Sequence, residues 1–180
     1  MSRIGKKIIN LPENVLVSQD NALNKIDVKG KLGNLSIVLP AYLNLEINNN
    51  NICVTVKDEQ DKKQRSSWGT YRSLVNNIVV GVSEGFKREM ELNGVGFKME
   101  LVGKLLTLNI GFSHTVKIDV PEAIALDINK NLISGSSIDK QLLGDFFMKI
   151  HNMKPCDVYK QKGFKIPGRY YRKKVGKKAK

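Results

Sequence analysis

Apolar and polar residues alternate over several short stretches in the first part of the chain. The alternation covers residues 26–28, 35–37, 45–47 and 52–56. A period of two places one face of a strand against a core. Residues 30–34 and 48–51 between these stretches are rich in Gly and Asn, which favour turns. These stretches are therefore predicted to be strands of an antiparallel sheet.

The spacing of apolar residues becomes helical from about Gln64 to Val82. Side chains three or four positions apart form one face of a helix. The run ends at Ser83-Glu84-Gly85, where glycine is typical of a helix C-cap. We predict a helix that covers one face of the first sheet through Trp68, Tyr71, Leu74, Val75, Ile78 and Val82.

The second half of the chain repeats the first. Residues 38–47 align with residues 119–128, and Gly30 aligns with Gly111 in the same register. Strands are predicted near residues 87–95, 97–101, 105–111, 115–120 and 126–134, and a helix begins at Ser137 or Asp139 and stops before Pro155. The predicted fold class is α+β, with two tandem similar domains, each an antiparallel sheet with one helix packed on a face. The predicted domains are 1–82 and 83–154, followed by an irregular basic tail, 155–180.

Charge narrows the range of partners. The 180 residues hold 30 Lys and Arg against 17 Asp and Glu, and the formal net charge is +13. A polyanion is therefore the expected partner. A membrane is not, because the most apolar stretch, 78–82, is too short to cross a bilayer and the start of the chain leads into no apolar leader. The two cysteines, Cys53 and Cys156, fit a reducing compartment.

Catalytic chemistry has no support in the sequence. His114 and His151 lack other histidines or cysteines at metal-binding spacing. Gly94-Val95-Gly96 is not followed by a helix, as a dinucleotide-binding loop requires. We expect no catalytic residue, no metal, no cofactor and no small-molecule substrate. A cationic enzyme acting on phosphorylated substrates is the weakest hypothesis, because an acid, base and metal cluster is missing.

Basic and aromatic residues are interleaved in the tail. Lys and Arg neutralise phosphates, and tyrosines can stack on unpaired bases, which favours RNA over duplex DNA. Gly163 and Gly168 are expected to let the backbone approach phosphates, and the segment is expected to need a counter-charge to become ordered. A merely solubilising tail is the alternative. The candidate RNA-binding residues here are Lys154, Tyr159, Lys160, Lys162, Gly163, Lys165, Arg169, Tyr170, Arg172, Lys173, Lys174, Lys177 and Lys178.

Several motifs in order along the chain resemble the bacterial-type large-subunit ribosomal protein L-six family. They are residues 1–7 with 11–12, 68–70 with 72–82, 84–86 with 92–97, 111–114, 139–141, and 154–155 with 159–163. The resemblance implies two copies of a small α+β fold and binding to large-subunit rRNA near the sarcin-ricin loop and the stalk base. It makes Tyr159, Lys160, Lys162 and Gly163 the binding signature, supported by Lys140 and Gln141. The chain departs from the family at Val158 and at residues 164–168.

The resemblance also implies partners and a location. Large-subunit rRNA and neighbouring large-subunit proteins near the stalk base are the expected direct partners, and translational GTPases are indirect ones. Departures from the family motif, residue usage that suggests an AT-rich genome and the lack of a leader resemble an organelle-encoded copy, in a mitochondrion or plastid. The bacterial cytoplasm is the alternative. A free RNA chaperone or regulator outside the ribosome is the competing function.

Overall fold

The fold is that of a computed structural model, which describes residues 2–20, 24–48 and 50–176. The chain divides into two compact units, Met1–Gly85 with Ile138–Lys140, and Phe86–Ser137 with Gln141–Lys180. The division lies three residues beyond the boundary expected at 82, and the segment after Pro155 groups with the second unit. The reason is a strand in that segment, described below.

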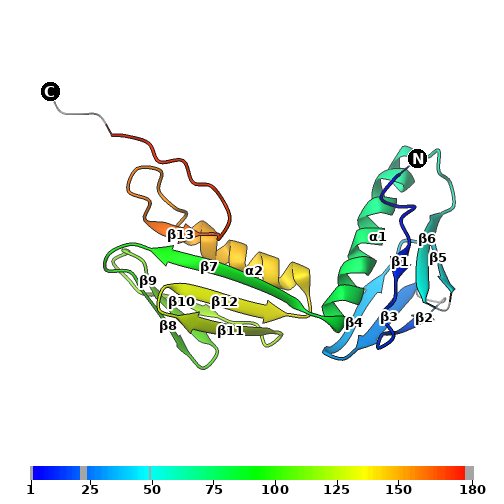
Figure 1. The fold of residues 1–180 in the computed structure, drawn as a ribbon, viewed down its shortest axis with the longest axis horizontal. Helices are drawn as coiled ribbons and strands as arrows, with labels where there is room; N and C mark the ends of the chain where they lie inside the picture. The colour runs from blue at the N-terminus through cyan, green and yellow to red at the C-terminus, as the bar shows by residue number, and fades with distance from the viewer. Residues whose placement is uncertain (1, 21–23, 49, 177–180) are drawn as a thin grey trace. The chain divides into compact units, whose positions relative to one another are not determined.

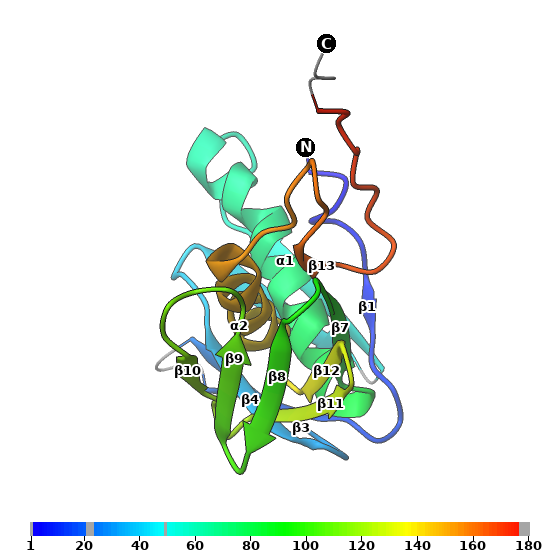
Figure 2. The same ribbon diagram turned by 90° about the vertical axis from the view of Figure 1, so that its left-hand side faces the viewer.

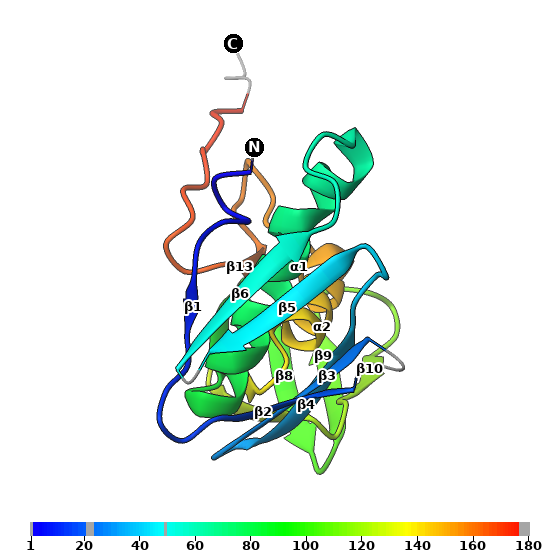
Figure 3. The ribbon, with the colours of Figure 1, turned by 90° about the vertical axis from the view of Figure 1, so that its right-hand side faces the viewer.

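The first unit contains two three-stranded antiparallel sheets and one helix. Its sheets have the strand orders β1-β6-β5 and β2-β3-β4. Figure 3 shows β5 and β6 side by side as one hairpin. The alternating pattern indicated the last four strands, but not β1, which has only two residues, or β2. The bounds are β1 (Ile9–Asn10), β2 (Leu16–Asp20), β3 (Lys25–Gly30), β4 (Gly33–Val38), β5 (Leu43–Asn48), β6 (Asn51–Val56) and α1 (Lys62–Ser83).

Helix α1 forms where the helical spacing predicts it and starts two residues earlier. The side chain of Asp61 caps its N-terminus by accepting a hydrogen bond from Lys63 N at 3.0 Å. Gly85, with φ of 76°, follows its C-terminus and donates to Gly81 O at 3.1 Å, so the predicted C-cap is confirmed. The apolar face packs on both sheets of the unit through Trp68, Val75, Val79 and Val82.

The second unit has the same plan with one added strand. Its sheets have the orders β11-β12-β7-β13 and β10-β9-β8, and Figure 2 shows β9 between β8 and β10. The prediction of a single strand over 126–134 was wrong, because the chain reverses after Asn129 with Lys130 at φ of 53°. The bounds are β7 (Phe86–Asn93), β8 (Lys98–Val102), β9 (Leu105–Asn109), β10 (Val116–Asp119), β11 (Ile124–Asn129), β12 (Leu132–Ser137), α2 (Lys140–Met153) and β13 (Gly163–Lys165).

The internal repeat extends to individual hydrogen bonds. Leu11 N donates to Asn50 O at 2.7 Å, and Leu92 N donates to Asn131 O at the same distance. The turns before β5 and β11 are closed by matching bonds to Pro40 O and Pro121 O, both of 3.0 Å. The prediction of two tandem α+β domains is therefore confirmed.

A single hydrophobic core holds the second unit together. Helix α2 begins directly after Asp139, as predicted, and lies along the sheet that contains β7 and β12 (Figure 1). Its buried side chains meet Met90, Leu92 and Ile133 from that sheet. They are Leu143, Phe146, Phe147 and Ile150. Across the described ranges, neither helix is long and apolar enough to cross a membrane.

Candidate nucleic-acid interface

The basic segment after Pro155 is fastened to the second unit by β13. This strand pairs antiparallel with β7, with Phe164 opposite Leu92. The Phe164 side chain is fully buried in the core, and its backbone N donates to Lys154 O at 2.9 Å. Most of the segment lacks regular secondary structure, as expected. Contacts within the unit set its course near Phe164, because this buried aromatic ring anchors the segment to the core.

Gly163 allows this close attachment. It has φ of 127°, and a Cβ placed on it would lie 2.6 Å from the carbonyl oxygens of both Lys154 and Pro155. Residues other than glycine rarely adopt this backbone conformation. Gly163 is buried, so its missing side chain lets two segments of this chain approach each other. The sequence-based expectation was different, because it assigned Gly163 to a close approach between the backbone and a phosphate.

A tight loop over residues 157–162 displays the predicted binding signature. Its ends are joined by a hydrogen bond from Asp157 N to Lys162 O, and Gln161 N donates to Asp157 O, both at 2.9 Å. The Asp157 carboxylate accepts from Lys160 N at 3.0 Å and Tyr159 N at 3.3 Å. These two N–H groups, Lys160 first, hold the pKa of Asp157 below its usual value. The loop leaves Tyr159 and Lys160 exposed.

A second turn, over residues 166–171, lies beside the first. The Tyr171 hydroxyl accepts a hydrogen bond from Ile166 N at 2.9 Å, and the Arg169 guanidinium lies 5.7 Å from the Tyr171 ring centroid. Gln161 Nε2 in the first loop donates to Tyr171 O at 3.5 Å, and beyond the second turn Lys174 N donates to Val158 O at 2.9 Å. Tyr171 is therefore used for internal structure. Tyr170, in contrast, is 87% exposed.

Positive charge on this surface is not balanced within the unit. Asp157 is the only acidic residue after Asp145 in the sequence. None of the Lys and Arg side chains of this segment forms an ion pair with a carboxylate in the part of the chain that the structure describes. The exposed ones are Lys160, Lys162, Arg169, Arg172, Lys173 and Lys174, while Lys154 and Lys165 are half-buried.

An aromatic pair adjoins the base of the segment and was missed as a site by sequence reasoning. The rings of Phe112 and His114 stack with centroids 5.9 Å apart and an interplanar angle of 11°. Lys154 Nζ lies 4.9 Å from the Phe112 centroid, and Phe112 is 41% exposed. The Gly-Phe-Ser-His motif was the available signal, but sequence alone does not bring it to Lys154.

Lys140 and Gln141, which were predicted to support the binding signature, are not part of the basic segment. Gln141 is in the first turn of α2, whereas Lys154 follows its last turn, so the length of the helix separates them. Lys140 groups with the first unit, where its ammonium group donates to Asn77 Oδ1 at 3.3 Å. Lys177 and Lys178 lie outside the described residues. The structure therefore gathers the predicted residues from Lys154 to Lys174, but not Lys140 and Gln141.

Metal chemistry has no candidate in this surface. No group of three or more His, Cys, Asp or Glu residues at metal-binding distance occurs among the described residues. The thiol of Cys156 has a raised pKa, mainly because of its burial, and a raised pKa disfavours the reactive thiolate.

The fold and this surface define a class of protein: a tandem α+β repeat that presents a cationic face with exposed aromatic rings. The family model described as "Ribosomal protein L6" matches residues 11–85 and again residues 93–166, in agreement with the repeat. The chain belongs to this family, which is one of structural ribosomal components and not of enzymes.

Curated relatives resemble the chain along its whole length. The protein named "Large ribosomal subunit protein uL6" of Campylobacter jejuni is 43% identical over 182 residues, covering 100% of this chain and 99% of its own. Proteins of the same name from Beijerinckia indica and Desulfosudis oleivorans are each 40% identical, covering 99% and 98% of this chain and 99% of their own.

Proposed function

We propose that this protein is a structural constituent of the large ribosomal subunit that holds large-subunit rRNA with the basic segment 154–174. One observation carries the proposal. A segment rich in Lys and Arg is fixed to the core by Phe164, yet its charges have no carboxylate partners among the described residues. Each cation that meets a phosphate releases condensed counterions, which favours binding to RNA.

The fixed course of the segment adds to this electrostatic attraction. The Asp157 loop and the 166–171 turn set the backbone course at Lys160, Lys162 and Arg169. Binding therefore costs less conformational entropy than it would for a disordered tail. Capture of RNA followed by ordering of the segment, expected from the sequence, is the alternative mechanism.

Exposed rings give the surface a preference for RNA with unpaired bases. Tyr159 and Tyr170 are exposed, and Lys154 lies beside the Phe112 ring of the Phe112–His114 stack. Stacking of a base on an aromatic side chain is tolerant of sequence and suits loops and bulges. The family resemblance makes the region near the sarcin-ricin loop and stalk base the proposed RNA, with neighbouring proteins there as further partners and translational GTPases as indirect ones.

Lys140 and Gln141 remain proposed rRNA contacts, separate from the segment. The proposed location is the ribosome. Relatives from bacteria favour the bacterial cytoplasm, and an organelle-encoded origin stays a prediction.

Sedimentation of the cellular protein, followed by crosslinking, tests the proposal. The protein should migrate with large subunits, and Tyr159, Lys160 and Arg169 should crosslink to rRNA in that fraction. A slow soluble pool that is crosslinked to other RNAs would instead indicate a free chaperone or regulator.

A further inference from the structure

A second basic surface lies on the first unit, along α1. Ser2 and Ile4 lie beside the N-terminal half of this helix and form with it a groove of about 560 Å³. The helix residues that line the groove recur every three or four positions, so they share one face. The opposite face carries Trp68 and Val75 into the core. The groove face is therefore free of any role in core packing; it consists of Lys62, Arg65, Ser66, Gly69, Thr70 and Ser73.

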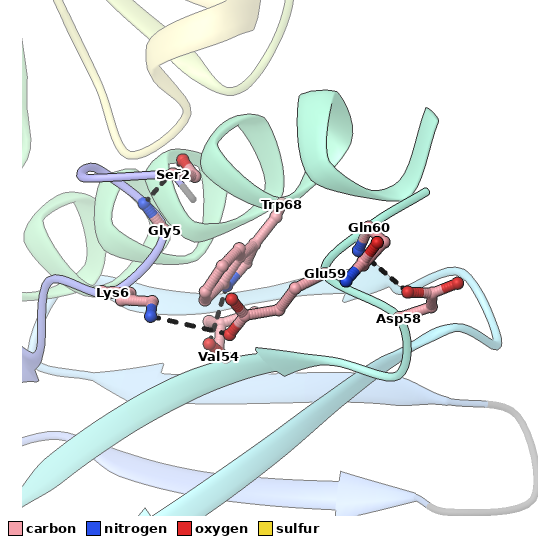
Figure 4. Close-up of polar contacts among 8 residues, drawn as sticks. All are labelled: Ser2, Gly5, Lys6, Val54, Asp58, Glu59, Gln60 and Trp68. Carbon is pink, nitrogen blue, oxygen red and sulfur yellow. Dashed lines mark hydrogen bonds and ion pairs between the residues drawn. The ribbon is translucent and has the colours of Figure 1, made fainter. Parts of the chain in front are cut away.

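The N-terminal segment that faces α1 across the groove, with Ser2 and Ile4, is held in place by specific contacts. Figure 4 shows Gly5 N donating to Ser2 Oγ, at 3.2 Å, and Trp68 Nε1 donating to Val54 O, at 2.7 Å. A Cβ on Gly5 would lie 2.5 Å from Trp68 Cδ2, so the turn rests directly on the indole. Arg72 Nε also donates to Lys7 O at 2.9 Å. Terminal segments usually fray unless they are tied down. The groove is therefore formed in advance of any ligand.

The first turn of α1 carries the wrong charge for helix stability. It contains Lys62, Lys63 and Arg65 and no acidic residue. The positive end of the helix dipole favours anions at this position and disfavours cations. A sequence feature that disfavours the local structure without a gain in stability elsewhere commonly marks a functional site. Lys62, Lys63 and Arg65 outnumber the single capping carboxylate of Asp61, so an anion bound in the groove would offset the remaining positive charge.

One carboxylate, that of the N-cap residue Asp61, already lies at this end of the helix, and it does not line the groove. Asp61 Oδ1 accepts from Lys63 N, and Glu59 pairs with Lys6 at 3.6 Å. Asp58 accepts from Gln60 N at 2.8 Å (Figure 4). None of the three lines the groove. Ser2 Oγ accepts the N–H of Gly5, which leaves its O–H as a donor for a ligand.

We propose that this groove binds phosphate groups of the RNA that the basic segment holds, so that the first unit makes a second, independent RNA contact. The inference rests on the proposed function for the identity of the RNA. Arg65 has the planar fork that matches a phosphate, Lys62 adds a point charge, and the Ser2 and Thr70 hydroxyls add neutral donors. An acidic protein segment fits less well, because Ile4 is the only large apolar side chain in the lining to anchor it.

Binding of full-length protein to protein-free large-subunit rRNA over a range of salt tests the proposal. The variant Lys62→Ala/Arg65→Ala removes both cations of the groove. The matched control Lys29→Ala/Lys31→Ala removes two exposed cations from the same unit, outside the groove. The groove variant should lower the slope of log affinity against log salt by about 1.5, because each phosphate contact contributes roughly 0.7–0.9. Its melting temperature should equal or exceed that of the parent protein, since alanine relieves the unfavourable charges. The control variant should change neither quantity.

The segment variant Lys160→Ala/Lys162→Ala/Arg169→Ala, measured in parallel, separates the two proposals. If the segment variant lowers the salt slope while the groove variant keeps the slope of the parent protein, the groove proposal is overturned and the proposed function stands. If both variants keep the salt slope of the parent protein, both proposals are overturned. Unchanged rRNA binding by the groove variant together with poorer incorporation into large subunits would reveal an acidic protein partner, which also overturns the RNA assignment.

Discussion

Replacing Gly163 by alanine separates the shape of the basic segment from its charge. The change adds one methyl group and removes no cation. At φ of 127°, a side chain costs about 1–3 kcal/mol in backbone strain. The new Cβ would also lie 2.6 Å from two carbonyl oxygens, so these must move. Burial of the Phe164 ring contributes about 1.5–3 kcal/mol, which is comparable. We therefore expect β13 to detach in a large fraction of molecules while the rest of the unit stays folded.

Detachment should weaken RNA binding without changing its salt dependence. Apparent affinity falls with the fraction of molecules in the binding-competent form. Strain equal to the burial energy of Phe164 leaves about half of the molecules attached, a loss of roughly 2-fold, and strain that exceeds this energy by about 1.5 kcal/mol gives a loss of roughly 10- to 15-fold. The salt slope should stay close to that of the parent protein, because every cation is retained.

Hydrogen exchange and rRNA titration together check this prediction. The Phe164 amide, which donates to Lys154 O, should lose its protection in the Gly163→Ala variant. Gly176→Ala is the matched control, because a Cβ there meets nothing within 4 Å. A protected Phe164 amide together with the parent affinity would refute the account of a pre-shaped segment.

Three further predictions concern single side chains. Asp157→Ala removes the one carboxylate of the segment, so charge alone predicts tighter rRNA binding. We expect weaker binding in titrations, because Tyr159 N and Lys160 N lose the carboxylate that accepts their hydrogen bonds. The lowered pKa of Asp157 means that its support of the loop is complete above the ordinary Asp pKa and is lost as pH falls through the lowered pKa; the Lys160 amide chemical shift should follow this change, and a flat profile would contradict it. Phe112→Leu keeps apolar volume but removes the ring, so affinity should fall by roughly 1–3 kcal/mol per stacked base with an unchanged salt slope; a reduced slope would point to displacement of Lys154 instead.

The sequence predicted the parts of the fold that depend on local pattern. Alternation located β3 to β6, and helical spacing with Asp139 and Gly85 located α1 and α2. The repeat gave the tandem plan. The hairpin of β11 and β12 was missed, although the polar run Asn129-Lys130-Asn131 and the aligned Asn-rich turn at 48–51 offered the clue.

What the sequence could not give depends on long-range contacts. β13 has only three residues and shows no alternating pattern of its own, so only its pairing with β7 makes it a strand. The burial of Phe164, the approach of Lys154 to Phe112 and the placement of Ser2 beside α1 arise in the same way. The density of basic residues marked the segment after Lys154 as a candidate. It did not reveal that this segment has a fixed course or that α1 carries a second basic surface.

The central claim is that cations held on the second unit meet phosphates of large-subunit rRNA. Removal of the tail after Met153 tests it poorly, because that change also takes Phe164 out of the core. The salt dependence of rRNA binding by full-length Lys160→Ala/Lys162→Ala/Arg169→Ala is the direct measurement. The account predicts weaker binding and a slope reduced by roughly 2–3. A slope and an affinity equal to those of the parent protein would contradict it.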